Sequence, residues 1–367
     1  IDTTITDFAG PPSKMVYTNQ YFNPAAGDDP LNPPVACSHG TMTASVAAGI
    51  GNNGVGISGV AWGNKVHLIS LRVFDSGCAN ASDPAIINAL TYARTTLVGA
   101  GLGKIVVNMS LGGVGSCPTA ISDELKLDVA AGITVIIATG NNGGAVEYPA
   151  NCATAAAGII PVGASDSSDN IASFSSRGPE LASYGVIAPG VNVLADDVSP
   201  GLGNTTTASG TSLAAPHVAG VAALMLSANN ALTPAQIQSM IRSSADNVGI
   251  ATLGNSSGGG RLDAARAINL AVNGTAGSSD LDEKTFAFPN PFRPSQDSLV
   301  TFNIPKGKEG SSRAIKIYTT AGQFVRSVTG LTWDGKTDAG KLVASGVYMF
   351  SISLGDKVLN GRVAVIR

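Results

Sequence analysis

The chain has 367 residues, of which 44% are hydrophobic and 13% are charged, so it is long enough for two or three domains with a large core. Its formal net charge of −3 excludes a strongly basic surface, and we expect no nucleic-acid partner. No apolar run approaches the ~20 residues that cross a bilayer, so we also expect no membrane span.

Helical and strand-like segments alternate along residues 1–272, a pattern typical of an α/β domain with a mostly parallel sheet. A small-residue helix is predicted after residue 41, and residues 65–73 alternate as a strand does. The expected elements that follow are an amphipathic helix over 83–100, buried strands over 105–109, 134–138 and 158–163, and helices over 121–131 and from Ser212, Thr233 and Gly260.

Residues 210–220 read Gly-Thr-Ser-Leu-Ala-Ala-Pro-His-Val-Ala-Gly and display Ser212 at the start of a long apolar helix. Pro216 is expected in the first turn of this helix, where a missing N–H costs little. Free backbone donors and the positive end of the helix dipole meet at such a terminus, which suits a developing negative charge. A serine N-cap on a buried helix is the alternative interpretation.

This stretch resembles the nucleophile motif of the subtilisin-like serine peptidases, G-T-S-x-A-x-P-x-V-A-G. In that family the catalytic residues follow the chain order Asp, His, Ser. The resemblance therefore implies a triad of Asp2, His39 and Ser212, with His39 in an H-G-T motif that opens a helix. It implies a three-layer subtilisin-like fold and no cofactor for catalysis.

Asp2 lies in a segment that resembles the tail of the family pattern V-x-V-I-D-T-G-I, with Thr4 in place of the usual glycine. The buried strand that leads into this pattern is missing. We therefore interpret the chain as N-terminally truncated, with a signal peptide, a propeptide and the first strand upstream. A solvated terminal residue is the alternative for Asp2.

Three segments resemble parts of the family's substrate groove. The S-L-G-G motif at residues 110–113 follows a buried strand, and by resemblance its backbone pairs with an extended peptide. Asn141 stands in a Gly-Asn-Asn-Gly turn. The resemblance implies that its side chain and the Ser212 amide stabilise the negative oxygen that forms on the substrate carbonyl. The alternative is that this segment is a plain glycine turn. Glu147 is expected to border the pocket for the residue before the cut bond, where basic side chains would be tolerated. The substrate-binding residues assigned in this way are Ser110, Leu111, Gly112, Gly140 and Glu147.

Residues 52–57 resemble the family's calcium loop, where asparagine side chains and backbone carbonyls supply oxygen ligands. The ligands implied are Asn53, Val55 and Ile57. The usual acidic partner is absent, and Asp7 is the substitute that the sequence offers. An ordinary asparagine-rich turn is the alternative.

The four cysteines permit two disulfides and an oxidising compartment. Sequence alone allows three connectivities. The P-A-N-C pattern at residues 149–152 resembles a secreted bacterial branch of the family, and this resemblance implies the pairs Cys37–Cys78 and Cys117–Cys152. A free thiol at Cys37, near His39, is the alternative.

Composition changes after residue 272, and we predict a peptidase domain over 1–272, a polar linker over 273–281 and a second domain over 282–367. Short alternating strands with Gly and Asp turns predict an all-β Ig-like sandwich there. P-N-P-F, W-D-G and S-G-V-Y motifs resemble the FlgD-like or type IX secretion sorting domains of bacterial secreted proteins. By resemblance the secretion machinery would recognise this domain; a spacer is the alternative.

These patterns predict a monomeric bacterial endopeptidase, secreted or at the cell surface, that hydrolyses peptide bonds in polypeptides. Two other classes stay open: a protease-like binding protein without activity, and a surface protein whose C-terminal domain carries the main interaction.

Overall fold

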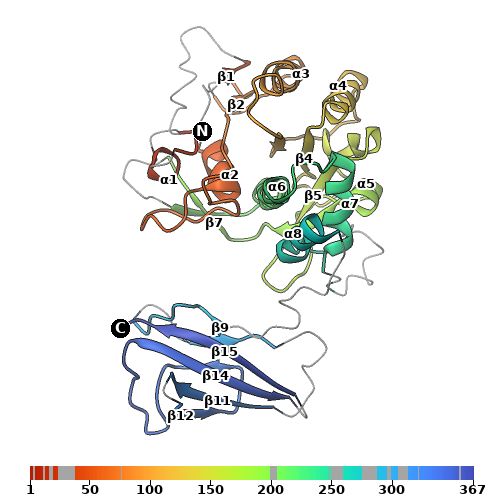
Figure 1. Cartoon of the computed structure of the whole chain (residues 1–367). Helices are drawn as coiled ribbons and strands as arrows, with labels where there is room; N and C mark the ends of the chain where they lie inside the picture. The colour runs from red at the N-terminus through yellow and green to blue at the C-terminus, as the bar shows by residue number, and fades with distance from the viewer. Residues whose placement is uncertain are drawn as a thin grey trace. The chain divides into compact units, whose positions relative to one another are not determined.

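The computed structural model describes residues 1–2, 5–10, 13–15, 20–23, 38–75, 77–198, 205–246, 248, 259–274, 287–295, 299–304, 313–320, 322–354 and 357–367. The chain divides into two compact units, Ile1–Ala276 and Gly277–Arg367. The described helices belong to the first unit, and the second is made of strands (Figure 1).

A parallel sheet with the strand order β3-β4-β5-β6 lies at the centre of the first unit. Its strands are β3 (Val106–Met109), β4 (Thr134–Ala138), β5 (Ile159–Ser165) and β6 (Val186–Pro189). Every residue of β4 and β5 is buried, which explains why both strands read as continuous apolar runs.

Helices cover both faces of this sheet (Figure 1). Val135 and Ile137 of β4 share one core cluster with α3 and α4, whereas Ile136 and Ala138 share another with α6, α7 and α8. Alternate side chains of one strand therefore enter two different cores, and the unit has three layers. The helices are α1 (Thr6–Ala9), α2 (His39–Ala48), α3 (Asp83–Tyr92), which continues into π-helical η2 (Ala93–Leu97), α4 (Thr119–Ala130), 3₁₀-helical η3 (Ala150–Ala155), α5 (Pro179–Tyr184), α6 (Thr211–Ala228), α7 (Pro234–Ser244) and α8 (Ala264–Asn273).

Helix α6 lies between α2 and the sheet and is buried along most of its length (Figure 1). At Gly220 it passes so close to α2 that an added Cβ would lie 2.8 Å from the Ala47 carbonyl oxygen. Among the described residues, α6 is the one helix that is long and apolar enough by length and composition to cross a membrane. Because 67% of the tested window is buried inside the protein, this is weak evidence for a span.

The strand predicted over residues 65–73 is much shorter in the structure. Only β2 (Leu71–Arg72) forms, paired in parallel with β1 (Gln20–Tyr21), and a single bridge joins Leu68 to Met15. Residues 16–19 of the partner segment, between Met15 and Gln20, lie outside the described residues.

A hairpin of β7 (Val193–Asp196) and β8 (Thr205–Ala208) lies beside α2 and the start of α6. Ala195 of β7 packs in one cluster with Val46 of α2 and Leu213 of α6. This cluster connects α2 and the first turn of α6 to the hairpin.

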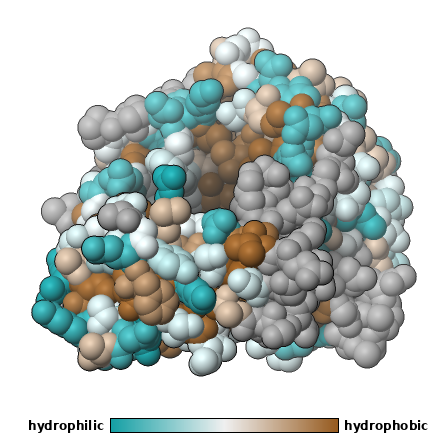
Figure 2. Space-filling view, turned by 60° about the horizontal axis from the view of Figure 1, so that its bottom comes forward, coloured by the Kyte–Doolittle hydropathy of each residue, from teal (hydrophilic) through white to brown (hydrophobic). Residues whose placement is uncertain are grey.

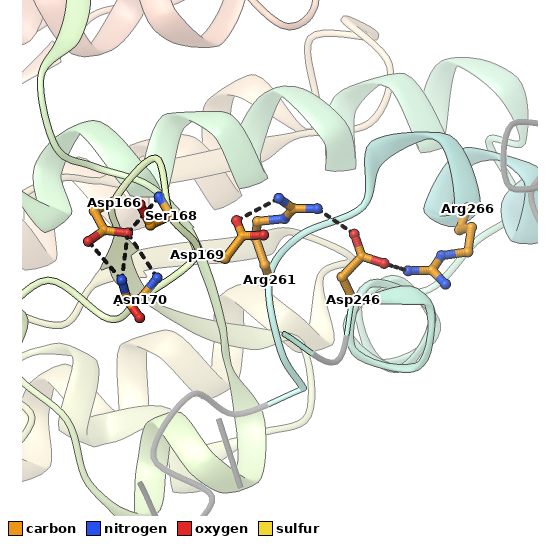
Figure 3. A network of polar contacts seen from close by, with 7 residues as sticks. All are labelled: Asp166, Ser168, Asp169, Asn170, Asp246, Arg261 and Arg266. Carbon is orange, nitrogen blue, oxygen red and sulfur yellow. Dashed lines mark hydrogen bonds and ion pairs between the residues drawn. The ribbon is translucent and has the colours of Figure 1, made fainter. Parts of the chain in front are cut away.

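An ion-pair network holds the segments behind the sheet together (Figure 3). Arg261 pairs with Asp169 at 2.6 Å and with Asp246 at 2.5 Å, and Asp246 also pairs with Arg266 of α8. These ion pairs join the loop after β5 to the end of α7 and to the segment that leads into α8. The partly buried carboxylates also raise the pKa of Arg261.

The second unit contains two antiparallel sheets that share one hydrophobic cluster. The cluster includes Trp333, Phe302 and Phe350, whose rings pack at tilted or edge-on angles. One sheet has the order β13-β10-β9 and consists of β9 (Ala287–Phe288), β10 (Val300–Phe302) and β13 (Thr332–Trp333); the other has the order β12-β11-β14-β15 and consists of β11 (Arg313–Thr319), β12 (Phe324–Val328), β14 (Gly346–Leu354) and β15 (Lys357–Val365).

The surface is mixed in polarity. Figure 2 shows one face on which hydrophilic residues surround smaller apolar areas. The exposed large apolar side chains, such as Trp62, Val114 and Phe288, are spread over both units.

Candidate active site

The turn after β4 is fastened to the first turn of α6. The Asn141 carbonyl Oδ1 accepts hydrogen bonds from the Thr211 backbone N–H at 2.8 Å and from the Thr211 hydroxyl at 3.0 Å. The same hydroxyl accepts one from the Gly140 N–H at 3.1 Å. Thr211 is fully buried, so this connection is shielded from water.

These bonds fix how the Asn141 amide is oriented. Because Oδ1 is held by Thr211, the Nδ2 end stays available, and it donates to no residue in the part of the chain that the structure describes. The Ser212 N–H likewise has no partner among the described residues, as expected in the first turn of a helix. A Cβ added to Gly210 would lie 3.5 Å from Asn141 Nδ2 and 3.7 Å from the Ser212 nitrogen, so the two donor nitrogens lie close to one point beside Gly210.

Pro216 lies in the second turn of α6, not in the first as the sequence predicted, because the helix already begins at Thr211. A proline has no N–H, so the Ser212 carbonyl, four residues earlier, loses its helical donor. The Ser110 hydroxyl donates to this carbonyl at 2.7 Å, and Asn108 Nδ2 in turn donates to the Ser110 hydroxyl at 3.0 Å. The end of β3 therefore holds the backbone of Ser212 in place.

The S-L-G-G segment after β3 lies against the segment around Tyr148. Gly113 and Tyr148 exchange backbone hydrogen bonds of 2.8 and 3.0 Å. Gly112 has no room for a side chain, because a Cβ there would lie 2.6 Å from the Tyr148 carbonyl oxygen. The groove residues that the sequence predicts are thus brought to the carboxyl ends of β3 and β4.

Glu147 lies under the turn that carries Asn141 and is only 9% exposed. Its Oε1 accepts hydrogen bonds from the Asn142 N–H at 3.2 Å, from Asn142 Nδ2 at 2.8 Å and from the Ser176 hydroxyl at 3.0 Å. Gly140 has a φ of +104°, and a Cβ there would lie 2.1 Å from the Glu147 carboxyl carbon. Glu147 therefore holds the turn, and its predicted contact with substrate stays a prediction.

His39 is the first residue of α2, which packs against α6. Its side chain is exposed, yet the surrounding protein removes enough water to lower the pKa of the imidazole. Among the described residues the imidazole makes no hydrogen bond, either to Asp2 or to Ser212. Catalytic hydrogen bonds are often long before substrate binds.

Asp2 lies against the first turn of α2. Its N–H donates to the hydroxyl of the buried Thr41 at 2.9 Å. The Ile1 nitrogen is 3.9 Å from the position of a Cβ on Gly40, next to His39. The structure thus brings the first two residues to the helix that begins with His39.

The predicted calcium loop lies beside α1. Asp7 is 2% exposed, and its carboxylate accepts hydrogen bonds from Asn53 Nδ2 at 2.6 Å and from the Ile57 N–H at 2.8 Å. The residues present fit a calcium site in their chemistry, because an ionised carboxylate, a side-chain amide and loop carbonyls are hard oxygen ligands.

A disulfide of 2.04 Å joins Cys117 to Cys152, 35 residues apart. It connects the segment before α4 to η3. Cys37 lies outside the described residues, so the pair Cys37–Cys78 stays a prediction, although Cys78 is disulfide-bonded.

Sequence reasoning missed several residues of this region. Thr211 holds Asn141, Asn108 holds Ser110, and Ser176 holds Glu147. Thr211 was visible as the residue before the serine in the matched motif, and Ser176 lies in a segment, residues 171–179, that also matches a family signature. Their bonding partners lie elsewhere in the chain, except for the partner of Asn108, which is two residues away.

A serine at a helix N-terminus, beside two N–H donors that no other group uses, is the arrangement of enzymes that transfer acyl groups through a serine. Residues 7–260 match the subtilase family, and the chain belongs to this family of subtilisin-like serine endopeptidases. The matched range includes His39, Asn141 and Ser212 and begins after Asp2.

Curated relatives agree with this assignment. An extracellular protease of Xanthomonas campestris pv. campestris is 35% identical over 285 residues, which are 74% of this chain and 47% of that protein. Subtilisin DY of Bacillus licheniformis is 39% identical over 58% of this chain and 71% of its own length, and Subtilisin E of Bacillus subtilis is 39% identical over 58% of this chain and 51% of its own length. The chain thus spans about half the length of several relatives.

Solved structures show the same fold. A cold-adapted subtilisin-like serine proteinase has a TM-score of 0.57 and 28% identity, covering 72% of this chain and 85% of that one. The Prenylagaramide maturation protease PagA has a TM-score of 0.58 and 25% identity, covering 75% of this chain and 90% of that one. The first unit therefore has a subtilisin-like α/β fold.

Proposed function

We propose that the chain hydrolyses peptide bonds in polypeptides with Ser212 as nucleophile, His39 as general base and Asp2 as the residue that orients His39. The observation that carries this proposal is the pair of unused donors, Asn141 Nδ2 and the Ser212 N–H, whose nitrogens lie close to one point at Gly210, two residues before the serine. Both are preorganised, because Asn141 Oδ1 and the Ser212 carbonyl are already bonded elsewhere.

The reaction would follow from these positions. Ser212 Oγ attacks the peptide carbonyl, and His39 accepts the hydroxyl proton. The carbonyl oxygen becomes negative and is stabilised by Asn141 Nδ2 and the Ser212 N–H. His39 then protonates the leaving amine, and water repeats the sequence on the acyl-enzyme while Asp2 stabilises the imidazolium.

A fluorophosphonate probe tests whether this serine is activated. We expect the probe to label the full chain at Ser212, the Ser212→Ala variant not at all, and the His39→Ala variant far more slowly. An Asp2→Asn variant with unchanged labelling would remove Asp2 from the proposal and leave the other two residues. No labelling of the native chain would favour the alternative of an inactive, protease-like binding protein.

We further propose that substrate binds as an extended chain along residues 110–112, with Gly140 and Glu147 near the pocket for the residue before the cut bond. Oε1 of Glu147 accepts the hydrogen bonds that hold the Asn141 turn. The charge of this buried carboxylate would favour a basic substrate residue before the cut bond. Peptides that differ only in Lys or Phe before the cut bond test this. Faster cleavage of the Phe peptide would refute it.

Catalysis itself would use no cofactor. We propose a structural calcium ion held by Asn53, Val55 and Ile57 with the Asp7 carboxylate, which would tie the loop over 52–57 to α1. Calcium would supply no step of the reaction; it would stabilise the fold by binding only the folded chain.

The relative from Xanthomonas is an extracellular protease, and a disulfide joins Cys117 to Cys152; both support secretion of this chain. We propose a monomer with a peptidase domain over 1–272, a linker over 273–281 and an Ig-like β-sandwich over 282–367. The two antiparallel sheets around one cluster support the sandwich. The secretion machinery would recognise this domain. Deleting residues 282–367 should then block export and spare peptidase activity, and unchanged export would refute the sorting role.

A further inference from the structure

A second buried carboxylate lies at the loop over residues 52–57. Asp196 is the last residue of β7, is 3% exposed, and neither of its oxygens accepts a hydrogen bond from the described residues. Such a group is costly to bury unless something compensates it.

Asp196 and Asp7 converge from different elements on the same point. A Cβ on Gly56 would lie 2.1 Å from Asp7 Oδ2 and 2.6 Å from Asp196 Oδ1, so these two oxygens are less than about 5 Å apart. Gly56 has a φ of +54° and no side chain, and only this leaves room for both oxygens.

No basic group neutralises this pair. Within the described residues neither carboxylate takes part in an ion pair with a lysine, arginine or histidine. Two buried carboxylates in contact call for either a shared proton or a cation between them.

The surrounding atoms favour a cation with oxygen ligands. Asn53 reaches Asp7 with its amide, which can present Oδ1 instead of Nδ2 by rotating its last bond. We infer that Asp196 is a further ligand of the calcium ion proposed for the 52–57 loop, so that carboxylates from α1 and from β7 both bind it. This inference rests on the proposed calcium site and names the residue that completes it.

The ion would then connect parts that are far apart in the sequence. The Asp196 N–H already donates to the Ser45 hydroxyl of α2 at 3.0 Å, and Ala195 packs with Leu213 of α6. A calcium ion on Asp196 would therefore hold β7, α1 and the loop together beside α2 and the first turn of α6.

Calorimetric titration with calcium chloride tests the inference. The full chain is used with Ser212→Ala to prevent self-digestion, after removal of metal with EDTA. We expect this protein to bind one calcium ion, and Asp196→Asn to raise its dissociation constant about tenfold or more, because affinity depends on the number of charged ligands. Asp197→Asn removes the same charge one residue away from the site and should change the constant less than about twofold.

Thermal unfolding supplies a second readout that separates a ligand from a purely structural residue. Asp196→Asn has the shape of the native residue but removes the repulsion with Asp7. In EDTA its Tm should equal or exceed that of the Ser212→Ala parent, whereas in calcium it should lie below the parent. A Tm lower by the same amount in both conditions would overturn the inference.

The remaining outcomes separate the two proposals. If Asp7→Asn loses calcium binding while Asp196→Asn keeps the native constant, the calcium loop stands and the role of Asp196 is refuted. If the parent binds no calcium, both are refuted, and a shared proton remains as the explanation of the pair. Neither outcome bears on the peptidase activity, which the fluorophosphonate probe tests separately.

Discussion

The bond from the Ser110 hydroxyl to the Ser212 carbonyl gives the sharpest test of how the nucleophile is held. Ser110→Ala removes this donor and leaves the backbone of the S-L-G-G segment unchanged. Because Pro216 cannot donate, the partly buried carbonyl then has no replacement within its own helix.

The size of the effect follows from the cost of an unsatisfied carbonyl, about 1–3 kcal/mol. If about half of this, about 0.5–1.5 kcal/mol, appears in the transition state as displacement of Ser212, kcat falls about two- to tenfold, since about 1.4 kcal/mol is a factor of ten. KM should change less than about twofold, because the backbone atoms proposed to pair with substrate remain. The assay is steady-state hydrolysis of a chromogenic peptide.

Two variants make the result decisive. Ser243→Ala removes an exposed hydroxyl of α7 that also donates to a backbone carbonyl, that of Met240 at 3.3 Å, and it should leave kcat unchanged. Pro216→Ala supplies a new helical N–H for the Ser212 carbonyl, so Ser110→Ala should have a much smaller effect in that background. If Ser110→Ala leaves kcat unchanged, or lowers it equally with and without Pro216→Ala, the Ser110 hydroxyl does not replace the donor that Pro216 lacks.

The remaining predictions concern the oxyanion donor, pH and a buried acid. Asn141→Ala should lower kcat about 100- to 1000-fold with a small change in KM, and a loss below about tenfold would remove Asn141 from the oxyanion site. Desolvation lowers the pKa of His39, so the imidazole should stay neutral, and able to act as a base, below pH 6.5. The fall of kcat/KM on the acid side should therefore have its midpoint below pH 6.5. A midpoint above pH 7 would contradict this. Burial raises the pKa of Asp128 from 3.8 to about 7, so the folded chain binds more protons than the unfolded chain between these values and loses stability as pH rises through them. Asp128→Asn cannot ionise, and its Tm relative to the native chain should therefore be higher at pH 8 than at pH 5; the same difference at both pH values would show that Asp128 does not titrate in this range.

Local sequence patterns were sufficient to predict helices and strands of the central part of the first unit. The strand predicted over 134–138 is β4, and the helix predicted over 121–131 is α4 (Thr119–Ala130) within two residues. Both have strong periodicity or a continuous apolar run, which local sequence determines. The segment over 65–73 has an equally clear pattern, yet its described pairing is limited to the strand Leu71–Arg72 and a bridge at Leu68. The partner of a strand comes from elsewhere in the chain, and local sequence does not specify it.

The motifs of the candidate site could be located from sequence, but the contacts that hold them could not. Ser110 and Ser212 are separated by 102 positions, and nothing in either motif indicates which side chain replaces the donor that Pro216 lacks. Asp196 shows the same limit. The residues around it read as an ordinary strand end, and its burial against Asp7 arises only when β7, α1 and the 52–57 loop are folded together.

The residues that break local rules gather around Ser212, and each is compensated by a different element. Pro216 interrupts the hydrogen bonds of α6, and Ser110 from the end of β3 restores the lost bond. Gly140 takes a positive φ after β4, and the buried Glu147 holds the turn that follows it. Because the Ser212 carbonyl is held from the end of β3 and the turn that carries Asn141 is held by the loop before η3, the position of Ser212 and its two free donors depends on more than α6 itself. A loosened sheet should therefore lower activity before it unfolds the chain.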